Sequence, residues 1–413
     1  MSLPCTPTVT IRFGSGAGFG ATFQLGSTIN GILGTNVLGE SATTYVTPTT
    51  IQRISIRRGR TRELDSYNAG SATIQFLDTN GTWNPTNTAS YGTLIRPFNQ
   101  VQVTTTYSGT TYALFTGYVQ SWDYDWQPGT GTSIVTIQAT DAFRLFGLAN
   151  ITTVSGATAG EDTGARVTDI LTQISWPSTY RSIGTGSVTV QADPGTSRTA
   201  LQAIQDMEQT ELGAFFVAGD GKATFLSRGQ LSALAAESST TRADFRDTAG
   251  NYAKYQAIDV SYDDQDLANV VTVTRSGGTA QQVSDATSIN TYFRRSLDRT
   301  ALLMQTDAQA LSQANLILNY RKTARQVVNS ITTDLSVDAK TATTCLNADL
   351  CEAVNIVRTP VSGPTITFLA TIQSISHDID PNTWRCTIGT ALPLATAFIL
   401  GSTDFGILGT STL

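Results

Sequence analysis

Alternation of apolar and polar side chains with a period of two is the feature that most constrains the fold. Ala72, Ile74 and Phe76 alternate with polar neighbours, and similar runs recur through residues 1–150 and 326–390. Only 14% of the residues are charged, against about 25% in a typical soluble protein. The sequence therefore predicts a mainly β protein with two barrel-like modules, whose surfaces are covered by Thr, Ser, Asn and Gln.

The middle of the chain changes to a helical period. Val167, Ile170, Leu171 and Ile174 follow the i, i+3, i+4, i+7 pattern of one helix face, with Thr163 as the predicted N-cap. Residues from about 198 to Gly213 and from the Thr306–Gln309 capping box to about Arg325 predict two more helices. An α+β insertion between the two β modules is expected.

These patterns predict five parts. Residues 229–251 are polar and weakly periodic, which indicates a loop or a domain boundary. The expected division is an N-terminal β-barrel module at 1–150, an α+β insertion domain at 151–230, strands with a connecting helix at 231–325, a second β-barrel module at 326–395, and a C-terminal docking tail at 396–413.

One peptide occurs near both ends of the chain. FQLGSTINGILGT (23–35) and FILGSTDFGILGT (398–410) are identical at 10 of 13 positions. Glycine permits close backbone approach and the aliphatic residues supply anchors, so we expect two docking peptides. The alternative is two surface loops left by a duplication. The predicted interaction residues are Leu25, Gly26, Gly31, Ile32, Leu33, Gly34, Leu400, Gly401, Gly406, Ile407, Leu408 and Gly409.

A group of nearby arginines is a further candidate interaction site. Arg53, Arg57, Arg58, Arg60 and Arg62 could contact DNA or the carboxylates of a neighbouring subunit, because guanidinium groups form paired contacts with either. The net charge of -6 argues against broad binding to nucleic acid. A subunit interface that includes Arg57, Arg58 and Arg60 is therefore favoured.

Catalytic chemistry has few candidate residues. His377 is the only histidine, so a Ser-His or Cys-His hydrolase would have to use it. It lies in an expected strand, and a structural, hydrogen-bonding role is favoured. No catalytic, cofactor-binding or metal-ligating residue is predicted, and the chain is expected not to be an enzyme.

Two groups of acidic residues leave alternatives open. Asp263, Asp264 and Asp266 could bind Ca²⁺ or pair with arginine, but they lack the twelve-residue calcium loop, so turn capping is favoured. Glu208 and Glu211 share a helix face. A glycosidase needs two carboxylates across a cleft, whereas a solvated or arginine-paired face is the favoured interpretation.

The cysteines and tryptophans are expected to be structural. Cys5, Cys345, Cys351 and Cys386 lack zinc-site spacing and are predicted to be reduced and mostly buried, although Cys345 and Cys351 could pair if oxidised. Trp83, Trp122 and Trp126 are expected in the core or at an interface, with sugar stacking as the alternative. The chain has no leader peptide or membrane-span pattern, so synthesis in a bacterial cytoplasm is expected.

Several short motifs follow one another along the chain in an order that resembles one protein family. Arg57-Arg58-Gly59-Arg60 and Leu77-Asp78-Thr79-Asn80-Gly81 are followed by Phe115-Thr116-Gly117, Trp176-Pro177, Glu211-Leu212-Gly213 and Tyr262-Asp263-Asp264. Together they resemble the tail hub or minor tail proteins of tailed bacteriophages, which are related in fold to the trimeric baseplate hub of contractile tails. The resemblance covers most of the chain.

The resemblance implies a structural virion protein at the tail tip. Its expected form is a homotrimeric hub ring that joins the sixfold tail tube to threefold tip components and encloses the genome channel. Implied partners are a tail tube or distal tail ring protein, spike or fibre proteins, and genome DNA in the lumen. A receptor-binding tail protein and a tail-tip cell-wall hydrolase remain alternatives. Many hub chains add a C-terminal lysozyme or peptidase domain that this sequence lacks, so wall degradation is expected to belong to another protein.

Overall fold

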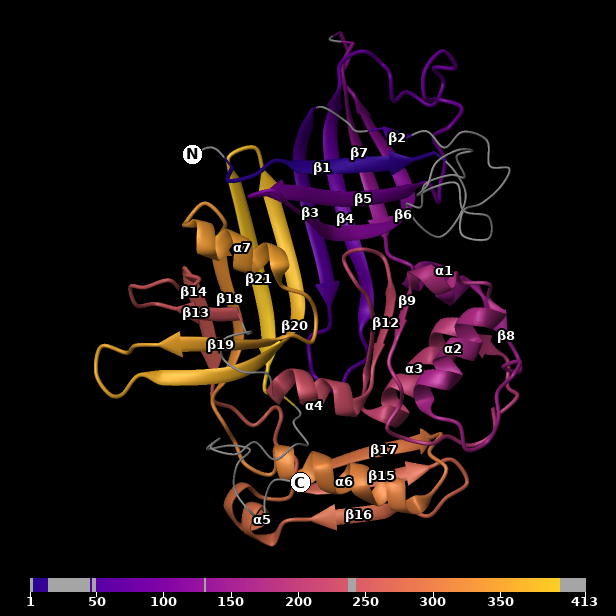
Figure 1. The fold of residues 1–413 in the computed structure, drawn as a ribbon, viewed down its shortest axis with the longest axis vertical. Helices are drawn as coiled ribbons and strands as arrows, with labels where there is room; N and C mark the ends of the chain where they lie inside the picture. The colour runs from indigo at the N-terminus through magenta and orange to yellow at the C-terminus, as the bar shows by residue number, and fades with distance from the viewer. Residues whose placement is uncertain (1–2, 14–44, 47–49, 130, 237–242, 394–413) are drawn as a thin grey trace.

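The computed structural model describes residues 3–13, 45–46, 50–129, 131–236 and 243–393 (Figure 1). The chain is mainly β with an α+β insertion, as the sequence predicts. Its largest element is one 13-stranded sheet in the order β14-β18-β21-β20-β3-β4-β7-β6-β5-β1-β2, with β19 and β13 branching from β20.

The first barrel-like module contains the seven N-terminal strands. Alternate side chains such as Ile74, Phe76, Val103 and Ile137 are fully buried, because successive residues of a strand point to opposite faces. The strands are β1 (Pro7–Arg12), β2 (Tyr45–Val46), β3 (Ile51–Gly59), β4 (Asn68–Asp78), β5 (Gln100–Tyr107), β6 (Thr110–Trp126) and β7 (Ser133–Thr140).

The second module uses strands from a long stretch of chain: β13 (Ala243–Arg246), β14 (Ala257–Ser261), β18 (Val327–Asp334), β19 (Ala353–Arg358), β20 (Ile366–Asp380) and β21 (Thr383–Ala391). Strand β13 pairs with β19 on one side and exchanges backbone hydrogen bonds with Ala253 on the other, while β14 pairs with β18. Strands β13 and β14 thus lie in the predicted segment 231–325 but pair with later strands. The predicted domain division stays a prediction.

An α+β unit follows β7: α1 (Phe143–Leu148), β8 (Asn150–Ile151), α2 (Thr163–Gln173), η1 (Ser178–Tyr180), β9 (Arg181–Ile183), β10 (Arg198–Thr199), α3 (Ala200–Glu211), β11 (Ala214–Val217), β12 (Ala223–Leu226) and α4 (Arg228–Ala236). Helix α2 is capped by Asp162 and not by Thr163, because the Asp162 carboxylate accepts bonds from two free N–H groups of the first turn. The prediction of a loop or domain boundary at 229–251 was wrong as to a loop where the chain forms helix α4 and, at 243–246, a strand.

A smaller unit with its own core lies at the bottom of Figure 1. It contains β15 (Val270–Arg275), β16 (Gln281–Ser284), α5 (Ala286–Tyr292), β17 (Ser296–Leu302) and α6 (Asp307–Arg321). Helix α6 packs on the sheet and begins at the predicted Thr306–Gln309 capping box. It ends at Arg321 and not at Arg325.

One further helix, α7 (Ala339–Asn347), interrupts the second module and was not predicted. Its buried face consists of Thr341, Ala342, Cys345 and Leu346, too few apolar residues to produce a clear helical pattern in the sequence. None of the helices in the described ranges has the length and apolarity that a membrane crossing requires.

Candidate inter-barrel junction

The two barrel-like modules are joined by direct pairing of β3 with β20. The register runs from Ile54 opposite Ile379 to Gly59 opposite Ser374. Gly59 has a φ of 117°, and a Cβ at this position would lie 2.2 Å from the backbone oxygen of Gln373. Only glycine combines this positive φ with so close an approach. The end of β3 therefore requires the glycine of the Arg57–Arg60 motif.

Arg58 connects the modules on one side of this seam. The side chain is buried, and Nη1 lies 2.8 Å from the Oδ1 atom of Asp349, which follows α7. Near Arg58, the buried Asp141 accepts hydrogen bonds from the backbone N–H groups of Gly70 (2.6 Å) and Phe143 (3.0 Å). Burial raises the pKa of Asp141 to about 7, although both bonds and Arg58 oppose the rise.

Arg60 makes the second connection. Its backbone N–H donates to the oxygen of Gln373 at 2.9 Å, and its Nε donates to Oε1 of the same residue at 2.7 Å. Nη1 donates to the oxygen of Asp65, and the guanidinium lies 4.4 Å from the centre of the Tyr67 ring. Burial disfavours the charge on Arg60, but nearby groups, chiefly Tyr67 and Cys351 and also Glu208 and Glu63, oppose burial and raise the pKa of Arg60 overall.

Tyr67 extends the junction to the α+β unit. Its hydroxyl lies 3.0 Å from Sγ of Cys351, which precedes β19, and its ring centre lies 5.4 Å from that of Phe216 in β11. Burial raises the pKa of Tyr67 well above its ordinary value. One buried cluster of Arg58, Arg60, Tyr67, Cys351 and Gln373 therefore contacts both β modules and the α+β unit. We call it the junction cluster.

The outer side of the seam is polar and exposed. Arg53 lies 3.7 Å from a carboxylate oxygen of Asp380, and Arg57 lies 3.6 Å from one of Asp378. Their side chains are 57% and 66% exposed, so these surface pairs contribute little stability. An open groove of about 710 Å³ runs beside the seam and is bordered by Arg57, Arg62 and Thr387 among others.

The predicted interaction residues thus separate into three sets. Arg57 is exposed, whereas Arg58 and Arg60 are buried in contacts within their own chain. The role of these arginines in subunit contacts stays a prediction. The repeated peptides at 23–35 and 398–410, with all twelve of their predicted interaction residues, lie outside the described residues.

Glu208 and Glu211 are both buried on α3, at 3% and 0% exposure. The Glu211 carboxylate accepts from the Thr163 hydroxyl at 2.7 Å and from the backbone N–H groups of Ser187, Val188 and Arg228. The prediction of a solvated or arginine-paired face was wrong for Glu211, because chain segments distant in sequence supply the donors that replace water. Glu208 lies near Arg60, and burial raises its pKa to about 7.

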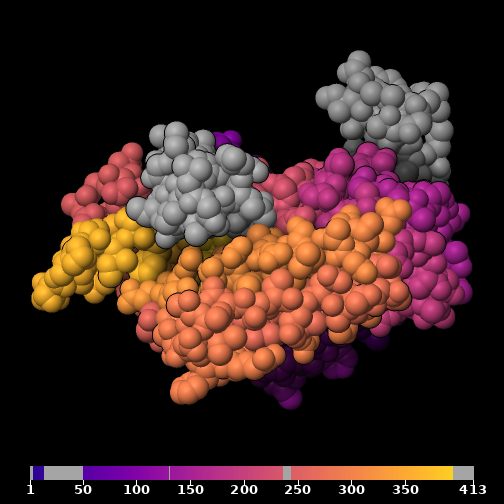
Figure 2. Space-filling view, turned by 90° about the horizontal axis from the view of Figure 1, so that it is seen from below, coloured from indigo at the N-terminus to yellow at the C-terminus, as the bar shows by residue number. Residues whose placement is uncertain are grey.

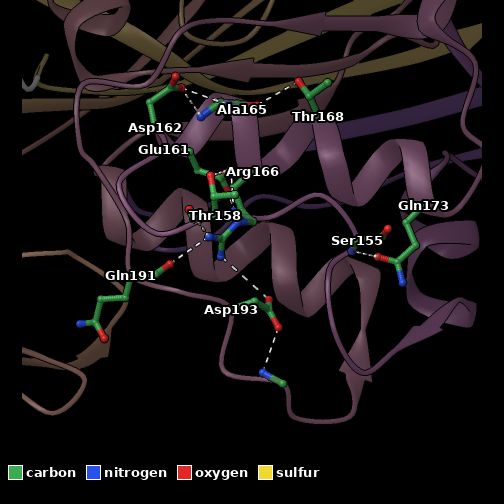
Figure 3. Close-up of polar contacts among 12 residues, drawn as sticks. Ser155, Thr158, Glu161, Asp162, Ala165, Arg166, Thr168, Gln173, Gln191 and Asp193 are labelled. Atoms are coloured by element: carbon green, nitrogen blue, oxygen red, sulfur yellow. Dashed lines mark hydrogen bonds and ion pairs between the residues drawn. The ribbon is translucent and has the colours of Figure 1, made fainter.

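Arg166 was missed by the sequence analysis, although it is fully buried on α2. Figure 3 shows its guanidinium between Glu161, Asp193 and two backbone oxygens. Nη2 donates to the oxygens of Thr158 (3.2 Å) and Gln191 (2.9 Å), and Nε pairs with Glu161. This arginine joins the loop before α2 to the segment between β9 and β10. The Glu161–Arg166 spacing alone did not distinguish it from a surface pair.

His377 has the predicted hydrogen-bonding role. It is buried in β20, and its Nδ1 accepts a hydrogen bond from Nε1 of Trp384 at 3.2 Å. A neutral imidazole that accepts at Nδ1 has its proton on Nε2. All four cysteines are buried and free, as predicted, and Cys351 contacts Tyr67 and does not pair with Cys345.

The acidic group at 263–266 is used in capping and ion pairs. Asp263 accepts from the N–H of Gln265 at 3.0 Å, Asp264 pairs with Arg295, and Asp266 lies 3.0 Å from Arg321. Turn capping, the favoured interpretation, therefore holds for Asp263, and arginine pairing, one of the alternatives, holds for Asp264 and Asp266.

The tryptophans at positions 83, 122 and 126 differ in exposure. Trp83 is a core residue, and Trp122 stacks on it with ring centres 6.1 Å apart. Trp126, near the tip of the β6–β7 hairpin, is 59% exposed.

The two β modules, their shared sheet and the inserted units together resemble known structures. A 43 kDa tail protein of prophage MuSo2 from Shewanella oneidensis superposes with a TM-score of 0.56 at 12% identity, over 93% of this chain and 98% of that one. A tail protein from Neisseria meningitidis gives 0.56 at 11% identity, over 84% and 94% of the two chains. The chain has the fold of a phage tail protein.

A third similar structure is a chain of the lidless PdpA-VgrG complex, with a TM-score of 0.51 at 10% identity. That match covers 94% of this chain and 65% of the other. No family model matches the sequence, and no curated protein matches it. The fold therefore agrees with the family resemblance of the sequence motifs.

Proposed function

We propose that the chain is a structural, non-enzymatic component of a phage tail tip, a hub ring between the tail tube and the tip. The observation that supports this most directly is the pairing of β3 with β20, which makes two barrel-like modules into one continuous sheet. Three copies of such a chain would present six similar modules to a sixfold tube above and threefold symmetry to the tip below.

The junction cluster supports this role because a symmetry adaptor needs two modules in a fixed relative position. Arg58 and Arg60 form buried, charge-assisted contacts across the seam, and such contacts specify one geometry more strictly than apolar packing does. Genome DNA would pass through the ring, and spike or fibre proteins would attach to the tip side. The repeated peptides at 23–35 and 398–410 would occupy ring-to-ring contacts.

Native mass measurement tests the proposal. The purified chain, or tail tips released from virions, should contain this protein as a trimer with a mass of three times 43.9 kDa. A monomer or hexamer in isolated tail tips would contradict the ring proposed here. Deletion of residues 398–413 should block incorporation into tails without unfolding the chain, if the repeated peptide docks between rings.

A receptor-binding tail protein is the second candidate, and the 59% exposure of Trp126 favours it. Aromatic side chains at a hairpin tip could stack on surface sugars. Direct binding of the purified chain to host cells, lost in Trp126→Ala, would support this function over the hub.

A further inference from the structure

An exposed aromatic residue occupies a strained backbone position directly after α5. Phe293 has a φ of 61° and a ψ of 173°, a region that is populated almost entirely by glycine. Its side chain is 85% exposed, so burial in the chain's own core does not offset the strain. Such a backbone conformation costs about 1–3 kcal/mol. Glycine at this position would avoid much of that cost, so the fold alone does not account for a phenylalanine.

A buried amide holds this position. Asn269 is fully buried, and its Nδ2 donates to the oxygen of Phe293 at 2.7 Å, while its Oδ1 accepts from the N–H of Arg295 at 2.8 Å. The backbone N–H of Asn269 also donates to the oxygen of Arg295 at 3.0 Å. The Asn269 side chain thus bonds to the backbone on both sides of Arg294, which fixes the turn before any partner is bound.

Of the basic residues at 294, 295, 321 and 322, only Arg294 has no carboxylate partner among the described residues. Arg295 pairs with Asp264, Arg321 lies 3.0 Å from Asp266, and Lys322 lies 3.3 Å from Asp285. Arg294 is exposed, and no carboxylate within the described ranges pairs with it. A surface that complements this turn must therefore supply a carboxylate beside an apolar pocket.

The turn lies on an accessible end of the molecule. Helix α5 is at the bottom of Figure 1, and the orange unit that contains it occupies most of the face seen from below in Figure 2. Aromatic side chains and arginine are enriched where proteins bind each other, and a fixed conformation reduces the entropy lost on binding.

We infer that Phe293 and Arg294 form a docking knob for a different protein of the tail, one whose surface has an apolar pocket bordered by a carboxylate. Phe293 would fill the pocket and Arg294 would pair with the carboxylate. This inference rests on the proposed function, because it takes the partner to be another tail component.

Site-specific photocross-linking in assembled virions tests the docking knob. Phe293 is replaced by p-benzoylphenylalanine, and the same residue placed at Val361, which is fully exposed on another hairpin, is the matched control. Irradiation should join position 293 to a second tail protein within a peptide that contains Asp or Glu. Arg294→Glu should lower that yield about tenfold, because the new carboxylate would face the carboxylate of the partner. Arg294→Lys should retain most of the yield.

Each other outcome contradicts the inference. A cross-link yield at 293 no higher than at 361, or a cross-link only to another copy of this chain, would overturn the docking knob and leave the hub proposal standing. Absence of the chain from virions would overturn the hub proposal and the knob together. Equal thermal unfolding of the wild type and both Arg294 variants excludes misfolding as the cause of a lost cross-link.

Discussion

Nε of Arg60 donates a hydrogen bond to Oε1 of Gln373 at 2.7 Å, and the backbones of the same two residues are bonded at 2.9 Å. These residues are 313 positions apart and belong to different β modules. Because both are buried, the modules cannot rotate about the seam without leaving a guanidinium unpaired away from water. The seam is thus a rigid part of the chain.

Arg60→Ala should destabilise the protein substantially. The substitution leaves the side-chain oxygen of Gln373 without its donor and the ring of Tyr67 without the guanidinium that packs on it. An unsatisfied buried acceptor alone costs about 1–3 kcal/mol. Urea denaturation monitored by tryptophan fluorescence measures the change. Arg62→Ala, an exposed arginine two positions later, is the control and should change stability by less than about 0.5 kcal/mol. Similar losses in both variants would contradict the importance of the seam.

Gly59→Ala should be far more damaging than Gly81→Ala. Both glycines have positive φ, at 117° and 67°, but a Cβ at 59 would lie 2.2 Å from the Gln373 oxygen, whereas nothing lies within 4 Å of one at 81. Gly81→Ala should therefore cost only about 1 kcal/mol of backbone strain. Gly59→Ala adds a clash with the backbone of β20 and should separate the strands. Thermal unfolding compares the two, and equal melting temperatures would contradict the close approach.

Because of Glu208, the stability of the folded chain should fall as the pH rises from about 4.5 to 7. Its folded-state pKa is raised to about 7 from 4.5, so the folded chain binds more protons than the unfolded chain in this window. The contribution is fully present at low pH and is lost as the pH rises through the folded pKa, by up to about 3 kcal/mol. Glu208→Gln should flatten this slope. Because other groups also titrate, the quantity to measure is the difference in free energy of unfolding between Glu208→Gln and the wild type at each pH. A difference that does not change with pH would refute the prediction.

Glu211→Ala should loosen the α+β unit locally. The carboxylate accepts from three backbone N–H groups, the buried one of Val188 and the partly buried ones of Ser187 and Arg228, and its loss leaves them without this acceptor. Each unsatisfied buried donor costs about 1–3 kcal/mol. Hydrogen exchange at these three amides should accelerate, while amides in α6 serve as the internal control. Unchanged protection at residues 187 and 188 would show that another acceptor replaces Glu211.

Local pattern in the sequence determined the types of most elements. Alternation predicted the strands that contain Ile74 and Ile137, and the Thr306–Gln309 box located the start of α6, because these signals depend on neighbours within one or two turns of chain. Helix ends were less accurate, as Asp162 in place of Thr163 shows, since two adjacent residues can both supply a capping oxygen.

Only the tertiary structure decided how distant segments are used. The motif from Arg57 to Arg60 was visible in the sequence, but no local pattern indicates that Arg57 is exposed while Arg58 and Arg60 are buried against Asp349 and Gln373. Burial of a charge depends on the partner that replaces water, and those partners lie hundreds of residues away. The same reason explains Glu211 and Asn269, whose roles depend on backbone groups that the fold brings to them.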